Sequence, residues 1–273
     1  MKNFLNVFFS FLLLGLFVNL GQAQDLLTKQ RELPCLNKKL SIVAHVTVND
    51  QGETNIEMDS IMAALDTLNK DFAPICVEFE ICAFDTIANY QYDEVEPDEW
   101  DEMQALYHQQ RRINLFFVTS FPDTDTTYCG VATQGGLSNL ENGGIVLLKG
   151  CESPLIRALS HQMGHYFGLN NTFNENGTMV TSELVNGTNC ETEGDNICDT
   201  PADPYVHGTD PNSYVNLQLN CRFTNMQQDA NGEFYVPDVG NIMSFYQAEC
   251  KCGFTLGQYL VMAANCQAAT DMW

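Results

Sequence analysis

Residues 159–173, LSHQMGHYFGLNNTF, constrain the fold most, because they combine a helical apolar pattern with two histidines and a glycine stop. Large apolar side chains recur every fourth residue at Leu155, Leu159, Met163 and Phe167. On an α-helix this spacing forms one stripe that faces a core. Each histidine lies two residues beyond a member of the stripe, about 200° around the helix. The pattern therefore predicts a helix with both histidines on the face opposite its core.

The two histidines, His161 and His165, are one helical turn apart on that face, where two imidazoles can bind one metal ion. Serine and proline at 153–154 predict the start of the helix, with the serine as its cap. Gly168 predicts the end, because glycine tolerates the left-handed conformation of a C-cap. The chain can turn sharply there and bring Asn171 back to the histidines.

The rest of the chain predicts an α/β layer followed by a loop-rich part. Alternating or fully apolar runs predict strands, and one stretch with helical spacing, in which Asp59 is a possible cap, predicts a helix. From about residue 169, Asn, Gly, Asp, Thr and Pro accumulate and periodicity fades. The predicted strands are 41–48, 75–84, 113–121 and 144–150, the helices are 58–72 and 255–267, and 95–108 is a surface helix or loop.

The N-terminus predicts export. Lys2 precedes an apolar run from residue 4 to 20, and Gly-Gln-Ala at 21–23 is typical of a cleavage site, so residues 1–23 are expected to be a signal peptide. The alternative is a membrane anchor, since a run of about 17 residues is near the lower limit for spanning. After cleavage no span is expected, and the protein would be secreted or periplasmic.

The charge excludes one class of partner. With 35 acidic and 12 basic residues the formal net charge is −23, and no basic stripe offsets it, so nucleic acid is not an expected partner. Eleven cysteines follow the predicted signal, which in an exported chain indicates disulfides with at least one thiol left over. Cys190, Cys198 and Cys221 are expected to pair locally. A cysteine-rich zinc site is disfavoured, because Cys250 and Cys252 are separated by a single residue.

Four stretches in order carry a family resemblance. Residues 161–173, HQMGHYFGLNNTF, resemble the zinc-binding motif H-E-x-x-H-x-x-G-x-x-H of the metzincin metallopeptidases, and are most similar to that of the pappalysin family. CETEGDNICDTPADP (190–204), NIMSFY (241–246) and FTLGQ (254–258) resemble that family's Asp-Thr-Pro segment, its Met-turn and the opening of its last helix. The resemblance covers roughly residues 140–265.

The resemblance implies a metzincin-like α/β fold with a twisted, mixed, mostly parallel sheet in one domain over residues 24–273. Its N-terminal subdomain, about 34–168, would be closed by the zinc helix. A loop-rich, disulfide-stapled C-terminal subdomain, about 169–273, would form the lower wall of the cleft. The family's function implies a zinc metalloendopeptidase that hydrolyses peptide bonds.

The resemblance also assigns roles by position, and three functional positions depart from the family. His161 and His165 match zinc ligands, and Met243 matches the Met-turn methionine. Gln162 stands where the family has its catalytic glutamate. The remaining two departures are Asn171 in place of the third histidine ligand and Phe245 in place of a tyrosine near the metal.

These departures weaken both binding and catalysis. A neutral amide at Gln162 cannot accept the proton that the glutamate takes from water. The amide oxygen of Asn171 is a poorer zinc donor than imidazole, so zinc is expected to be weakly bound or absent. Phe245 lacks a hydroxyl that could stabilise an oxyanion. His207, Glu183 and Glu191 are the residues that could stand in for the missing groups.

A calcium ion is a second expected cofactor. Asp195 and Thr200 of the Asp-Thr-Pro segment resemble such a site, with Asp199 beside them, although these residues can equally stabilise turns. Three functions remain open. The protein is an impaired peptidase that keeps a cleft for a peptide or protein ligand, an active metallopeptidase with an unusual ligand set, or a structural or adhesion module.

Overall fold

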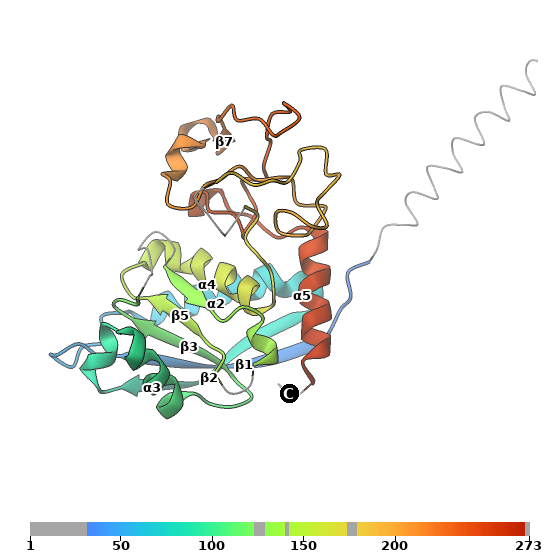
Figure 1. Ribbon diagram of the computed structural model, residues 1–273. Helices are drawn as coiled ribbons and strands as arrows, with labels where there is room; N and C mark the ends of the chain where they lie inside the picture. Colours follow the sequence, from blue (N-terminus) through green and yellow to red (C-terminus); the bar gives the residue numbers. More distant parts are fainter. Residues whose placement is uncertain (1–31, 123–128, 140–141, 174–178, 271–273) are drawn as a thin grey trace, which may run out of the picture. The chain divides into compact units, whose positions relative to one another are not determined.

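The computed structural model describes residues 32–122, 129–139, 142–173 and 179–270, without the side chains of residues 152–156 (Figure 1). The predicted signal peptide and the side chain of Leu155 lie outside these residues. By internal contacts the chain forms two units, residues 1–33 and 34–273, and every element named below belongs to the second. No helix in the described ranges has the length and apolar content needed to cross a membrane.

A five-stranded sheet of order β2-β1-β3-β5-β4 lies at the centre of this unit. Neighbouring strands β2, β1, β3 and β5 run parallel, whereas β4 pairs antiparallel with β5 and forms one edge. All six residues of β3, INLFFV, are buried, as expected of a parallel strand covered on both faces. The strands are β1 (Lys38–Thr47), β2 (Val77–Ile87), β3 (Ile113–Val118), β4 (Gly130–Ala132) and β5 (Ile145–Leu148).

Helices cover both faces of the sheet, with α2 (Met58–Phe72) and α4 (Glu152–Tyr166) on one face and α3 (Pro97–Tyr107) on the other (Figure 1). Phe72 of α2 packs edge-on against Phe79 of β2, with ring centroids 5.1 Å apart. Trp100 of α3 packs against Phe116 of β3 at 5.3 Å. Because side chains alternate along a strand, the strand register places Phe79 and Phe116 on opposite faces.

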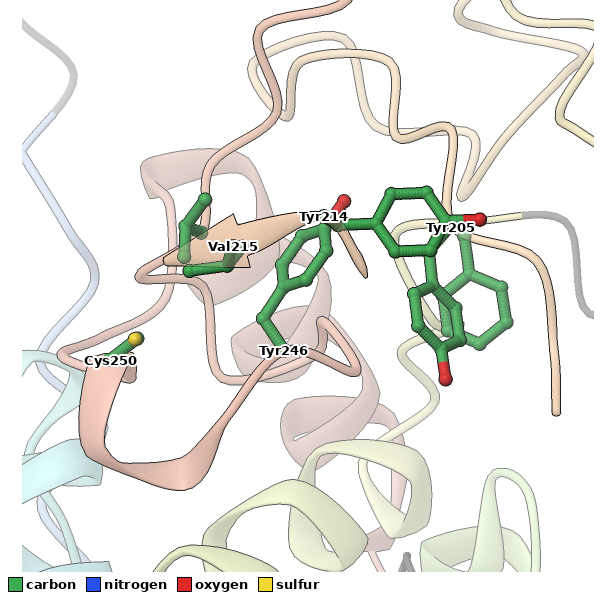
Figure 2. Packing of buried hydrophobic residues seen from close by; sticks show 7 residues of the cluster. Tyr205, Tyr214, Val215, Tyr246 and Cys250 are labelled. Atoms are coloured by element: carbon green, nitrogen blue, oxygen red, sulfur yellow. The ribbon is translucent and has the colours of Figure 1, made fainter. Parts of the chain in front are cut away.

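The part of the chain after α4 contains little regular structure. It has a short antiparallel pair, β6 (Val215–Asn216) with β7 (Arg222–Phe223), and ends in α5 (Leu256–Ala268). Its core is an aromatic cluster, of which Figure 2 shows Tyr205, Tyr214 and Tyr246 packed together. Their ring centroids are 5.3 to 6.1 Å apart. Helix α5 packs back on the first layer, where the hydroxyl of Tyr259 donates to the Asp71 carbonyl at 2.8 Å.

Three local predictions are wrong in detail. Helix α2 spans the predicted 58–72, but its N-cap residue is Glu57 and Asp59 lies in the first turn, where its charge favours the helix dipole. Helix α4 begins at Glu152 with Cys151 as N-cap, so Ser153 is not the cap. The reason is tertiary, because a disulfide to Cys129 and a bond from the Cys151 amide to Leu148 hold the chain there. Strand β2 begins at Val77, because residues 73–75 form a 3-10 turn.

Four disulfides are present: Cys35–Cys76, Cys129–Cys151, Cys190–Cys198 and Cys221–Cys250. The local pairing of Cys190 with Cys198 is confirmed. The prediction that Cys221 pairs within the same stretch is wrong, because its partner Cys250 is brought to it by the fold from 29 residues away. Cys82, Cys252 and Cys266 carry no disulfide, in agreement with the odd count.

Candidate functional site

Helix α4 brings the two histidine side chains together, as their spacing predicts. Their Nε2 atoms lie 3.2 Å apart. Nδ1 of His161 lies 2.7 Å from the Ile242 carbonyl, and Nδ1 of His165 lies 2.8 Å from the Leu169 carbonyl. Since a carbonyl only accepts, both Nδ1 atoms carry the proton and donate it. When both rings are neutral, the lone pairs of their Nε2 atoms face one another.

Two facing lone pairs at this distance repel unless a cation lies between them. Two imidazole nitrogens bound to one tetrahedral zinc ion lie about 3.3 Å apart, close to the separation found here. Donation from Nδ1 to a backbone carbonyl is also how metal-binding histidines are usually oriented. Burial lowers the pKa of His161 well below its usual value, and the charge of Lys251 acts in the same direction. The His161–His165 pair thus fits a divalent metal ion.

The segment around Met243 passes directly under the helix. Met243 is fully buried, and a Cβ at Gly164 would lie 2.4 Å from its sulfur, so only glycine allows this approach. Asn241 braces the turn, because its Oδ1 accepts from the Met243 amide at 2.9 Å and from Gln258 Nε2 at 3.1 Å. The structure thus brings the methionine predicted for the Met-turn to the helix that carries both histidines.

Lys251 is a further component of the site. Its ammonium donates to the Ile242 carbonyl at 2.8 Å and also to the Ser244 carbonyl. The Ile242 carbonyl is the acceptor used by His161, so the lysine and the histidine share one oxygen. Burial, with the nearby charge of Arg157, lowers the pKa of Lys251 to about 7.

The chain turns back after the helix, as Gly168 predicts. Gly168 has a φ of +93°, and its amide donates to the His165 carbonyl at 2.8 Å. Four residues later the amide of Thr172 contacts the Met243 carbonyl at 3.3 Å. Asn171, immediately before this contact, is buried with 7% of its surface exposed. The turn therefore returns Asn171 to the segment under the histidines.

Gln162, between the histidines in sequence, points to the edge of the sheet. Its Nε2 donates to the carbonyl of Gly130 in β4 at 2.9 Å, and the side chain is buried with 3% exposed. An ionised glutamate has only acceptors and could not make this bond. The side chain at the family's catalytic position is thus engaged as a donor.

Phe245 connects the histidines to the aromatic cluster of the later part of the chain. Its ring lies 5.4 Å from that of His161 and 4.6 Å from that of Phe173. The ring of His207 lies 6.0 Å from Phe245 on the same cluster. His207 and His161 therefore both contact the ring of Phe245.

The residues predicted for calcium divide into two places. Asp195 Oδ1 accepts from the Thr200 hydroxyl at 2.7 Å and from the Ile197 amide at 2.9 Å. Its Oδ2 is buried and makes no hydrogen bond. Asp199 instead caps helix α5, because it accepts from Gly257 N at 2.7 Å and from the Thr255 hydroxyl at 2.8 Å. The carboxylate of Asp199 is thus engaged at the N-terminus of α5 and not with Asp195.

Glu183 lies beside Asp195. A Cβ at Gly194 would lie 2.1 Å from Glu183 Oε2, so the carboxyl packs directly on this glycine. Burial, reinforced by the charge of Asp195, raises the pKa of Glu183 to about 8. Burial likewise raises the pKa of Asp195 to about 6. The two buried carboxyl groups lie together, and one of their oxygens, Asp195 Oδ2, accepts no hydrogen bond. Such a pair suits a hard cation such as calcium.

Among the described residues, no group of three or more His, Cys, Asp or Glu side chains is placed to hold a metal ion. At the zinc position the third predicted ligand is Asn171, and at the calcium position the ligand predicted beside Asp195 is Thr200. Neither residue type belongs to that set. Sequence reasoning missed Lys251 and Gly164, and it considered Glu183 only as a stand-in base. The one local signal was the glycine in an otherwise regular helix.

Comparisons with known proteins agree with this fold. No family model matches the chain. An extracellular metalloprotease of Pyricularia oryzae is 24% identical over 161 residues, which cover 56% of this chain and 56% of that protein. The chain thus spans about half the length of this curated relative.

Among solved structures, a promirolysin variant from Tannerella forsythia superposes with a TM-score of 0.59 at 17% identity, covering 89% of this chain and 84% of that chain. Metalloproteinase-II from Bacteroides fragilis has a TM-score of 0.35 at 13% identity, covering 54% of this chain and 46% of that chain. The fold is similar to that of promirolysin, and the predicted α/β class with a mixed, mostly parallel sheet is confirmed.

Proposed function

We propose that this metallopeptidase-fold protein is exported, is impaired as a peptidase, and uses its cleft to bind a peptide or protein segment. The observation that carries the proposal is the hydrogen bond from Gln162 to the Gly130 carbonyl at 2.9 Å. A carboxamide that donates at the position of the catalytic base cannot accept a proton from water. Loss of a general base typically costs about 10²–10⁴ in rate.

Zinc would be held by His161 and His165, with the Asn171 amide oxygen as a weaker third donor. When bound, zinc polarises a substrate carbonyl and acidifies bound water. In this chain the histidine Nδ1 atoms stay fixed by two carbonyls, and Phe245 presents a ring without a hydroxyl to this region. The weak donor at Asn171 supports low occupancy by zinc, and the carboxamide of Gln162 and the ring of Phe245 support poor proton transfer.

Peptide binding is supported by strand β4, which pairs with a strand on one side only in the part of the chain that the structure describes. An extended peptide can add to such an edge through backbone hydrogen bonds without any metal. Export is supported by the four disulfides and by the extracellular relative. A calcium ion at Asp195, with Thr200 and Glu183, would neutralise the buried carboxyls and stabilise the loop.

The test combines metal content with turnover. The purified wild-type protein should contain well under one zinc ion per chain by elemental analysis, and should cleave a peptide library no faster with zinc than with chelator. Stoichiometric zinc together with chelator-sensitive cleavage would establish the alternative, an active zinc metalloendopeptidase.

A gain-of-function variant tests the same idea from the other side. Gln162→Glu combined with Asn171→His restores a base and a third imidazole. We expect zinc-dependent cleavage at least about 10²-fold above wild type, the lower end of a general base's contribution. Asn171→His alone is the control, which should raise zinc content without comparable cleavage. If the double variant binds zinc and stays inert, the impairment does not lie in these two residues.

A further inference from the structure

Among the described residues β4 pairs with β5 alone, and its backbone amide and carbonyl groups point alternately toward β5 and toward the other edge. Thr133 N donates to Gly144 O, and Leu148 N donates to Cys129 O. In an antiparallel pair every second residue bonds to the partner strand, so residues 129, 131 and 133 face β5. The amide and carbonyl groups of Gly130 and Ala132 therefore point away from β5, toward the side where another strand could add.

Gln162 donates a hydrogen bond to the first of these outward-pointing carbonyls. Its carboxamide, carried by α4, donates to the Gly130 carbonyl at 2.9 Å, and the contact is buried. Gly130 also has no room for a side chain, because a Cβ would lie 2.3 Å from the Val146 oxygen and 3.4 Å from Cγ of Gln162. The close approach of strand and helix depends on this glycine.

Covalent and backbone links hold the same two elements together around this contact. The Cys129–Cys151 disulfide joins the residue before β4 to the residue before α4. Beyond the strand, the Gly135 amide donates to the His165 carbonyl at 3.0 Å. Gln162 lies between these two links along α4. Its hydrogen bond uses a carbonyl on the outer edge of β4. A glutamate there would place a negative oxygen against the carbonyl, so the amide supplies a bond that the acid cannot.

We propose that Gln162 is a positioning residue whose carboxamide holds the Gly130 carbonyl, so that an added peptide strand pairs with β4 from Ala132 onward and not at Gly130. The register of the peptide is thereby shifted along β4 by one acceptor. This step rests on the proposed peptide binding, whereas the Gln162–Gly130 clamp can be tested without any peptide.

Hydrogen exchange tests the clamp. Gln162→Met keeps the length of the side chain and removes the donor. Loss of the bond should raise the exchange rate of residues 129–133 by about tenfold, the equivalent of one buried hydrogen bond. Gln104→Met is the matched control, because Gln104 is also buried and donates to a carbonyl, that of Asn142 at 2.7 Å, from helix α3. The control should leave residues 129–133 unchanged. A change of less than about twofold in Gln162→Met overturns the clamp.

The wild-type protein provides a second measurement, which stands if the variant does not fold. With glutamine side chains isotope-labelled, the Nε2 protons of Gln162 should show a nuclear Overhauser effect to the α-protons of Gly130. Its absence in a folded sample overturns the proposal.

Peptide register is tested with a mixture of end-blocked decapeptides. Bound peptide should protect the Ala132 amide in wild type while the Gln162–Gly130 signal persists, and Gln162→Met should bind several-fold more tightly through the released acceptor. Loss of that signal on binding would overturn the displaced register. If no peptide binds either protein, the peptide-binding function and the register both fail, and exchange still decides whether the clamp exists.

Discussion

Gly164 shows how one residue determines the geometry beneath the two histidines. The sulfur of Met243 approaches the helix backbone so closely that a Cβ there would lie 2.4 Å from it. Both partners are held, because Met243 is fully buried and its turn is braced by Asn241. A single added methyl group must therefore move either the methionine or the helix that carries His161 and His165.

Gly164→Ala should accordingly lower the free energy of unfolding by about 1–3 kcal/mol, the usual cost of overpacking a core. Urea unfolding measures this change. The control is Gly150→Ala, because nothing lies within 4 Å of a Cβ at that position. An alanine at 164 that is as well tolerated as one at 150 would contradict the close contact with Met243.

Helices α2, α4 and α5 meet at one residue, Asp71. Asp71, at the end of α2, accepts from Arg157 at 3.1 Å and from the Ser160 hydroxyl at 2.6 Å, both on α4. The backbone carbonyl of the same residue accepts from Tyr259 of α5. Helix α5 is thus hydrogen-bonded to α2, one of the helices that cover the sheet. The loop-rich part of the chain lies between α4 and α5 in sequence, so both of its ends are anchored.

Asp71→Ala should cost about 2–3 kcal/mol in unfolding free energy, because it leaves Arg157 and Ser160 without their acceptor in a largely buried place. Ser160→Ala removes one hydrogen bond only and should cost about 1 kcal/mol. Denaturation of both variants measures the difference. Equal losses would mean that the ion pair to Arg157 contributes little to the contact between helices.

The buried ionisable groups make the stability of the whole molecule depend on pH in two directions. Burial lowers the pKa of His45, so its contribution to stability is present above about pH 6.5 and is lost as the pH falls. Glu183 behaves oppositely. Its pKa rises from 4.5 to about 8, so its contribution is complete below pH 4.5 and is lost as the pH rises through about 8.

Comparison with Glu183→Gln reports on this carboxyl and its coupling to Asp195, because His45 and Lys251 titrate in both proteins and cancel in the difference. Without calcium, wild type should lose stability relative to Glu183→Gln by up to about 1.4 kcal/mol per pH unit between pH 5 and 8. Thermal unfolding at several pH values, with and without calcium, measures it. Calcium should stabilise wild type more at pH 8 than at pH 6, and parallel curves for the two proteins would contradict the raised pKa.

Local patterns within the sequence determined much of the architecture. The spacing of apolar residues predicts α2 and α4, the strands β1, β2, β3 and β5 and the final helix, because each pattern is written over a few consecutive residues, whereas the three-residue strand β4 was not predicted. It also places His161 and His165 on one face, and Gly168 at the turn that follows them. The Cys190–Cys198 disulfide was predictable for the same reason, since eight residues separate the two cysteines.

Only the tertiary structure decided what these residues do together. Gln162 reads as a lost base in the sequence, but the fold brings it to Gly130, 32 residues away, as a donor. His161 takes its orientation from Ile242, 81 residues on, and Lys251 shares that carbonyl. The Cys221–Cys250 disulfide and the position of Glu183 beside Asp195 were likewise decided only by the tertiary structure. Periodicity encodes which face a side chain takes, whereas distant contacts depend on how the packed layers bring separate segments together.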